Sequence, residues 1–128
     1  MNEARHPILP MGFKCIGKRV GIRKKTGEDL MLLYSEQPCE AAAMFTKHSY
    51  CGACVQVGKK HIADGRLQAI VAVSGIANVA TGDTGVTHAM MMCNTAATEL
   101  GISQQDVLPS ATGIIGYQLP IEKIVDGL

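Results

Sequence analysis

The chain has 128 residues, of which 47% are hydrophobic and 18% are charged, and its formal net charge is +1 at pH 7. The length and composition indicate one globular domain rather than a disordered chain. The small net charge gives no electrostatic basis for a nucleic-acid partner. No apolar run approaches the ~18 residues of a membrane span, and the first residues lack a signal-peptide core. We therefore expect a cytoplasmic protein that does not contact a membrane.

Residues 1–11 contain two prolines and are predicted to form an N-terminal tail, and residues 12–128 are predicted to form a single α/β domain. Glycines interrupt residues 12–25, which carry six basic side chains and predict a strand or two with a basic turn. A phosphate-binding patch is the alternative, although no aromatic residues are interleaved. The apolar run 30–34 predicts a buried strand, and residues 38–45 a turn with small residues.

The middle of the chain predicts two further strands. Residues 55–57, Val-Gln-Val, indicate a short one, and residues 67–73 are the strongest strand signal in the chain. The second strand runs directly into Ser74 and Gly75.

Residues 84–100 give the best helix signal, because apolar residues recur at helical spacing and Gly101 follows at a position typical of a helix end. Asp83 or Thr84 is expected to cap its start, and the run Met90–Met92 is expected to fill core space. The apolar stripe consists of Val86, Ala89, Met90, Cys93, Ala97 and Leu100. Ser103 is predicted to open a short helical turn. Several strands around one clear helix indicate a mixed α/β fold.

The stretch 109–116 combines small and flexible residues between two apolar segments. Gly113 and Gly116 permit positive φ or a close approach of the backbone. A threonine hydroxyl at Thr112 beside a backbone N–H is a pair of donors suited to stabilise a developing oxyanion. A glycine-rich turn without function is the alternative that the residues alone leave open.

The stretch 73–82 also combines small residues with polar groups. Ser74 and Asn78 lie beside flexible backbone, which is a usual setting for a ligand-binding loop. Alternatively, the two side chains satisfy their own turns.

Five cysteines and four histidines are scattered along the chain. Cys51 and Cys54 form a CxxC motif, but the residues after it read as strand, whereas a redox pair needs a following helix to stabilise its thiolate. No second pair stands at a zinc-finger spacing. We therefore expect free thiols, no metal and no cofactor.

The order of the motifs resembles the N-terminal part of the ornithine acetyltransferase family, the glutamate N-acetyltransferases of arginine biosynthesis. The resemblance runs from about Gly12 to the C-terminus, and its most specific pieces are the loop 74–82 and the segment 112–116. The remaining pieces are Gly12-Phe13-Lys14, Val20 to Lys24, Asp29-Leu30, Ala41 to Ala43, Phe45-Thr46 and Leu100-Gly101-Ile102.

The resemblance implies a layered α/β sandwich of mixed sheets and helices, of the self-cleaving N-terminal-nucleophile type. In the family a precursor cleaves itself into α and β chains. The new N-terminal threonine of the β chain takes an acetyl group from N2-acetylornithine and passes it to glutamate; some members also use acetyl-CoA. By motif matching, the oxyanion-hole pair falls on the Thr112 hydroxyl and the Gly113 backbone N–H, with Ser74 and Asn78 as candidate substrate-binding residues.

The chain departs from the family pattern at Val73 and Ile76, where the family usually has asparagine, and it ends at Leu128, before the nucleophilic threonine. We therefore expect the N-terminal part of an α chain that acts in a hetero-oligomer, with the nucleophile on another chain. A self-cleaving aminopeptidase or amidase relative with a different acyl donor is the second hypothesis. A thiol or metal-binding module centred on Cys51 and Cys54 is the third.

Overall fold

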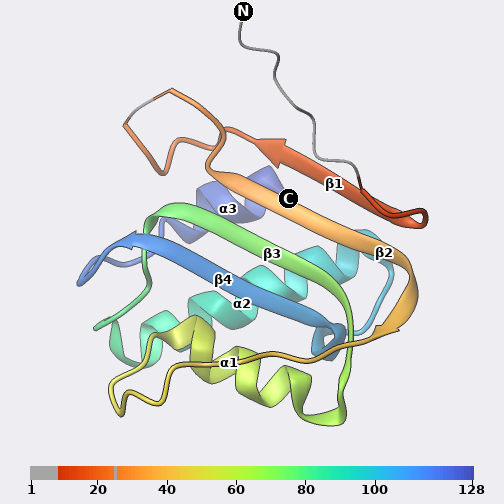
Figure 1. Cartoon of the computed structure of the whole chain (residues 1–128). Coiled ribbons are helices and arrows are strands. Elements are labelled where there is room, and N and C mark those ends of the chain that lie inside the picture. The colour runs from red at the N-terminus through yellow and green to blue at the C-terminus, as the bar shows by residue number, and fades with distance from the viewer. Residues whose placement is uncertain (1–8, 25) are drawn as a thin grey trace, which may run out of the picture.

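The computed structural model describes residues 9–24 and 26–128, and it shows one sheet with helices packed on one of its faces (Figure 1). The strands are β1 (Phe13–Lys18), β2 (Leu30–Glu40), β3 (Arg66–Ile76) and β4 (Val107–Ile114). They lie in the order β1-β2-β3-β4. β2 pairs antiparallel with both β1 and β3, whereas β3 and β4 are parallel. Most of the predicted N-terminal tail lies outside the described residues.

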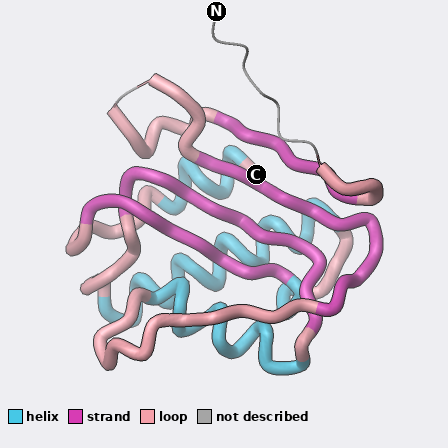
Figure 2. Tube along the Cα trace, in the orientation of Figure 1, coloured by secondary structure: helices cyan, strands magenta, loops and turns pink. Residues whose placement is uncertain are grey.

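Three α-helices are present in the described part of the chain: α1 (Ala53–His61), α2 (Gly82–Leu100) and α3 (Ile121–Gly127). Two 3-10 turns, η1 (Ile62–Asp64) and η2 (Gln104–Asp106), follow α1 and α2. Figure 2 shows that the helices lie together on one side of the sheet. A parallel strand pair needs a crossover connection, and α2 provides it between β3 and β4. None of the helices in residues 9–24 and 26–128 is long and apolar enough to cross a membrane.

The core lies between the sheet and the helices, and most of its buried residues belong to β3 and α2. Alternate residues of β3 face the helices, and every second one is buried, as the period of a strand requires. The core residues of these two elements are Leu67, Ala69, Val71, Val73, Ala89, Met92, Cys93, Ala96 and Ala97. Of the three methionines expected to fill core space, only Met92 is fully buried; Met90 and Met91 are 37% and 42% exposed.

The predicted strand at residues 55–57 is wrong, because these residues lie inside α1. The buried positions of this helix are Ala53, Cys54, Val57, Gly58 and His61. Four of them recur at the i, i+3, i+4, i+7 spacing of a helix face. Because Cys, Gly and His are weak hydrophobic signals, the alternation Val-Gln-Val dominated the sequence pattern.

The predicted helix at 84–100 is present but begins two residues earlier, at Gly82. Neither Asp83 nor Thr84 caps it; the preceding residue is Thr81, whose side chain makes no capping hydrogen bond. The predicted end is correct, since Gly101 adopts the left-handed conformation with φ of 66°. Ser103 accepts a hydrogen bond from Gln105 N at 3.3 Å and opens η2, as predicted.

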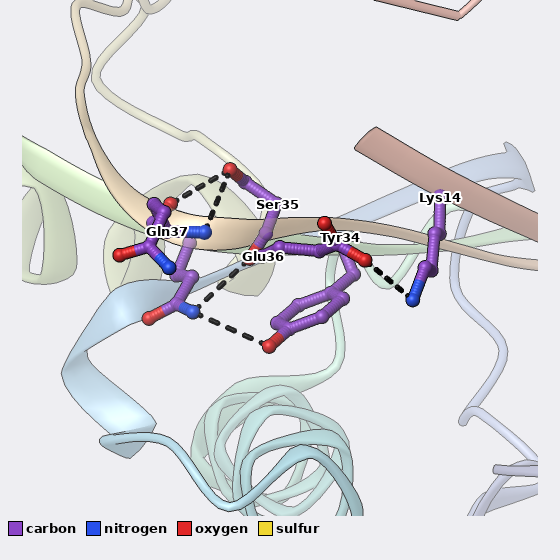
Figure 3. A network of polar contacts seen from close by, with 6 residues as sticks. Lys14, Tyr34, Ser35, Glu36 and Gln37 are labelled. Atoms are coloured by element: carbon purple, nitrogen blue, oxygen red, sulfur yellow. Dashed lines mark hydrogen bonds and ion pairs between the residues drawn. The ribbon is translucent and has the colours of Figure 1, made fainter. Parts of the chain in front are cut away.

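β2 is longer than predicted, because it continues through Pro38–Glu40, where the sequence indicated a turn. Its pairing with β3 shifts between Tyr34 and Cys39. Figure 3 shows the polar contacts around this irregularity. Ser35 Oγ donates to the Gln37 carbonyl at 2.7 Å, and Gln68 Nε2 donates to Tyr34 Oη at 3.4 Å.

The opposite face of the sheet is not covered by any helix of the described residues. Side chains of all four strands line a hollow of about 340 Å³ on this face. Its strand residues are mainly apolar and include Phe13, Leu33, Ile70 and Leu108. One face of the sheet is thus covered by the helices, and the other face is open and mainly apolar.

Candidate active site

The ends of β3 and β4 bring two of the predicted site segments together. In the parallel register Ser74 is paired with Thr112, and Gly75 with Gly113. Side chains at paired positions of neighbouring strands lie on the same face of a sheet. Ser74 and Thr112 therefore both point to the open face, away from the buried Val73 on the helix side, and Thr112 is exposed.

Gly113 lies directly against the backbone of Gly75 on β3. Its φ is 139°, and a Cβ built on it would overlap the carbonyl group of Gly75, which itself has a φ of 122°. Only residues without a Cβ fit this pair. The alternative of a glycine-rich turn over residues 109–116 does not hold for Thr112 and Gly113, because both lie in β4 and the bend begins at Ile115.

Two hollows meet at Thr112. The larger, of about 510 Å³, lies along β4 next to the start of α1, and its lining includes Tyr50, Cys51 and Gly113. The smaller, of about 330 Å³, lies on the open face, and its lining includes Ser74 and Asp29. Thr112 borders both, so a small molecule in either hollow could contact its side chain.

Asn78 lies apart from these hollows, inside the loop between β3 and α2. Its side chain is completely buried, and its backbone has a φ of 52°. Nδ2 donates to the Gly85 carbonyl at 2.9 Å, and Oδ1 accepts from Thr81 Oγ1 at 2.8 Å. The backbone carbonyl of Asn78 accepts a hydrogen bond from Ala53 N at 3.0 Å, at the start of α1. Through these bonds Asn78 positions the loop and the starts of α1 and α2. The predicted contact of Asn78 with a substrate stays a prediction.

Asp29 organises the loop between β1 and β2, next to Ser74. Its buried carboxylate accepts hydrogen bonds from the backbone N–H groups of Val20 (2.7 Å), Ile22 (2.7 Å) and Arg23 (3.0 Å). Burial raises the pKa of this carboxyl, but the backbone donors together outweigh burial and leave the pKa below its usual value. The backbone carbonyl of Asp29 also accepts a hydrogen bond from Ser74 N at 2.9 Å. The loop is therefore fixed to β3 beside the candidate site.

The CxxC motif lies at the start of α1, and the residues that follow it, which the sequence indicated as strand, are helical. The expectation that no helix follows the motif is therefore wrong. Cys54 is buried, and burial raises the pKa of its thiol, although a hydrogen bond from Asn78 opposes the shift. Burial also raises the pKa of Cys93 to about 12, with a contribution from Cys54. All five cysteines are free thiols. The described residues contain no group of three or more His, Cys, Asp or Glu side chains that could hold a metal ion.

The structure thus brings Thr112, Gly113 and Ser74 together and leaves Asn78 in a supporting position. It also places Arg23 beside Ser74, with Nη1 donating to Ser74 Oγ at 3.4 Å. Sequence reasoning counted Arg23 only as one of several basic residues. Its proximity to the site depends on how the loop folds across the end of β3, which no local pattern reveals.

The architecture is that of a known class of α/β acetyltransferase structures. A crystal structure of the arginine biosynthesis bifunctional protein ArgJ from Bacillus halodurans matches with a TM-score of 0.87 and 34% identity, over 91% of this chain and 61% of that one. Ornithine acetyltransferase from Mycobacterium tuberculosis, solved in complex with ornithine, matches with a TM-score of 0.81 and 35% identity, over 92% of this chain and 64% of that one. The predicted mixed α/β class is confirmed.

The chain belongs to the ArgJ family, whose model matches residues 14–128. ArgJ 2 from Clostridium acetobutylicum is 50% identical over 94% of this chain and 31% of its own length. ArgJ from Dehalococcoides mccartyi is 39% identical over 93% of this chain and 30% of its own length. The resemblance predicted from the motifs is confirmed, and the chain spans about a third of the length of these curated relatives.

Proposed function

We propose that the chain is the N-terminal part of the α chain of an acetyltransferase that moves an acetyl group from N2-acetylornithine to glutamate. Membership of the ArgJ family and the match to an ornithine-bound ornithine acetyltransferase support this proposal. The observation that carries it in the structure is the exposed Thr112 beside Gly113, at the end of a strand that borders a cleft. In this proposal both residues act as the oxyanion hole.

The backbone of β4 supports this role for Gly113. The Ile114 carbonyl accepts from Ala77 N at 2.9 Å, so it faces the β3 side of the strand. Backbone groups alternate in direction along a strand, and the Gly113 N–H is therefore directed to the free edge. Because β4 is the last strand of the sheet in the described residues, this donor is aimed at the cleft along that edge. In the proposal this N–H and the Thr112 hydroxyl together stabilise the developing oxyanion.

The reaction then divides between two polypeptides. A threonine hydroxyl from the remainder of the protein attacks the acetyl carbonyl of N2-acetylornithine, and Thr112 and Gly113 stabilise the alkoxide that forms. The C–N bond breaks, the ornithine amine leaves with a proton, and the acetyl group stays as an ester on the nucleophile. The glutamate amine attacks this ester through a second alkoxide at the same donors, and the nucleophilic hydroxyl is regenerated.

The open face of the sheet supports a requirement for a second polypeptide. Phe13, Leu33, Ile70 and Leu108 line an apolar hollow there, and contiguous apolar surface of this kind is characteristic of an interface. In the proposal the remainder of the precursor covers this face, after self-cleavage into α and β chains, in a cytoplasmic hetero-oligomer. Residues 12–128 then form one domain of that assembly.

The test combines the chain with the nucleophile-bearing part of the protein and measures acetyl transfer from N2-acetylornithine to glutamate. Thr112→Ala should lower turnover roughly a hundred- to thousandfold, the usual effect of removing one oxyanion donor. Thr112→Ser keeps the hydroxyl and should retain most of the turnover. Ser110→Ala is the matched control, because this hydroxyl lies two residues earlier on the same face of β4.

Equal turnover of the Thr112→Ala and Ser110→Ala assemblies would refute the assigned role. Release of free acetate without N-acetylglutamate would instead favour an amidase-type relative, in which water replaces glutamate as the acceptor.

A further inference from the structure

The loop between β3 and α2 forms part of the cleft that the proposed oxyanion donors border. Ala77 and Val79, on either side of Asn78, line this hollow of about 510 Å³. Their backbone groups bond to the chain directly after the proposed donors: Ala77 N donates to the Ile114 carbonyl at 2.9 Å, and the Val79 carbonyl accepts from Gly116 N at 2.9 Å. The loop around Asn78 is therefore tied to the end of β4.

The start of α1 forms another part of the same cleft, and it is bound to the same asparagine. Gly52 and Cys54 line the cleft. The Asn78 carbonyl accepts from Ala53 N at 3.0 Å, and Asn78 Nδ2 donates to Cys54 Sγ at 3.7 Å. A Cβ on Gly52 would lie 2.9 Å from Val79 Cγ2, so the loop and the helix start are in direct contact. Asn78 thus joins two walls of the cleft.

The side chain of Asn78 makes this link rigid. It is completely buried, and its amide also donates to the Gly85 carbonyl at 2.9 Å and accepts from Thr81 Oγ1 at 2.8 Å. The backbone φ of 52° is a left-handed conformation that asparagine adopts more readily than most residues with a Cβ. In a buried network of this kind, the loss of one partner leaves other polar groups unsatisfied.

We propose that Asn78 is a positioning residue for the acetyl transfer, because it fixes the end of β4 relative to the start of α1; this inference rests on the proposed function. Asn78 itself does not line the cleft, so it acts through the backbone groups that it holds. Oxyanion donors depend on their direction, and a misplacement of about 1 Å can cost about a hundredfold in rate. Since these bonds strengthen only in the transition state, the loss falls on the rate of acetylation rather than on donor binding.

The test measures single-turnover acetylation of the nucleophile-bearing chain by N2-acetylornithine, in the assembled protein and over a range of donor concentrations. Asn78→Gly accepts the left-handed backbone without strain and removes every hydrogen bond of the side chain. It should lower the saturating rate roughly ten- to hundredfold and change the half-saturating donor concentration by less than about threefold. Thr81→Val removes only the hydroxyl donor to Asn78 and should lower the saturating rate in the same way but less.

The Thr112→Ala background separates positioning from folding. Two donors that stabilise one oxyanion act as a unit, so the alignment of the second matters less once the first is removed. In this background Asn78→Gly should lower the rate further by less than about threefold. The matched control is Gln105→Met, which removes bonds to the carbonyls of Lys60 (2.8 Å) and His61 (3.1 Å) at the opposite end of α1. It should leave the rate unchanged.

Thermal unfolding of each assembly shows whether the variant is folded, and Thr81→Val in both backgrounds decides the question if Asn78→Gly does not fold. An equal factor in the two backgrounds, or an unchanged saturating rate in the folded variants, would overturn this inference while acetylation of the wild-type assembly still supports the proposed function. A wild-type assembly that N2-acetylornithine does not acetylate would refute the proposed function and this inference with it.

Discussion

The contact between Gly113 and Gly75 predicts a large difference between two glycine substitutions in the same segment. Gly113→Ala places a methyl group against the Gly75 carbonyl, at a φ of 139°. Gly116→Ala places one at a φ of 86°, with no atom within 4 Å. Positive φ costs about 1–2 kcal/mol in both variants. Displacing packed backbone adds about 1–3 kcal/mol at Gly113 alone.

The total expected loss in the free energy of unfolding is therefore about 2–5 kcal/mol for Gly113→Ala and about 1–2 kcal/mol for Gly116→Ala. Urea unfolding followed by far-ultraviolet circular dichroism measures the free energy of unfolding of both variants. The two values can be compared if the m-values of the variants are equal. Equal losses for the two variants would show that β3 and β4 do not approach closely at Gly113. The pairing of Thr112 with Ser74 in the parallel register would then be wrong as well.

Two further predictions concern buried titratable groups. Asp29→Asn removes charge-assisted bonds to three backbone donors and should cost about 2–4 kcal/mol in urea unfolding at pH 7. Because the pKa of Asp29 is lowered by folding, its contribution is complete above the ordinary carboxyl pKa near 4 and is lost as pH falls below it. The pH dependence of stability in acid should therefore be shallower in Asp29→Asn, and identical slopes would contradict the assignment. Cys54 and Cys93 should resist alkylation in the folded protein at pH 8 while exposed Cys15 reacts, as mass spectrometry of the labelled peptides can show; rapid labelling of Cys93 would contradict its burial.

The elements with strong periodicity were predictable from the sequence. Residues 69–73 of β3 are a continuous run of β-branched and small apolar residues, and α2 shows a helical stripe followed by a left-handed Gly101. In α1 the buried face contains Cys54, Gly58 and His61, which carry little hydrophobic signal. That helix exists because its face packs on β4 and α2, and a single local pattern does not contain this information.

A turn is an alternative for the residues of β4 because Gly113 and Gly116 permit positive φ. Pro109 is tolerated in a strand here because β4 lies at the edge of the sheet, where a missing N–H disrupts no second ladder. Gly113 is required by its long-range partner Gly75 rather than by a bend. Motif similarity is what proposes Thr112 and Gly113 as donors, whereas the arrangement of Arg23, Ser74 and Thr112 depends on strand register and on the loop held by Asp29.

A single-turnover experiment tests the central claim most directly. The assembled protein is mixed with N2-acetylornithine in the absence of glutamate, and intact-mass spectrometry follows the addition of one acetyl group to the nucleophile-bearing chain. The account predicts that acetylation occurs, that Thr112→Ala slows it roughly a hundred- to thousandfold, and that Thr112→Ser restores most of the rate. Acetylation of the Thr112→Ala assembly at the wild-type rate would contradict it.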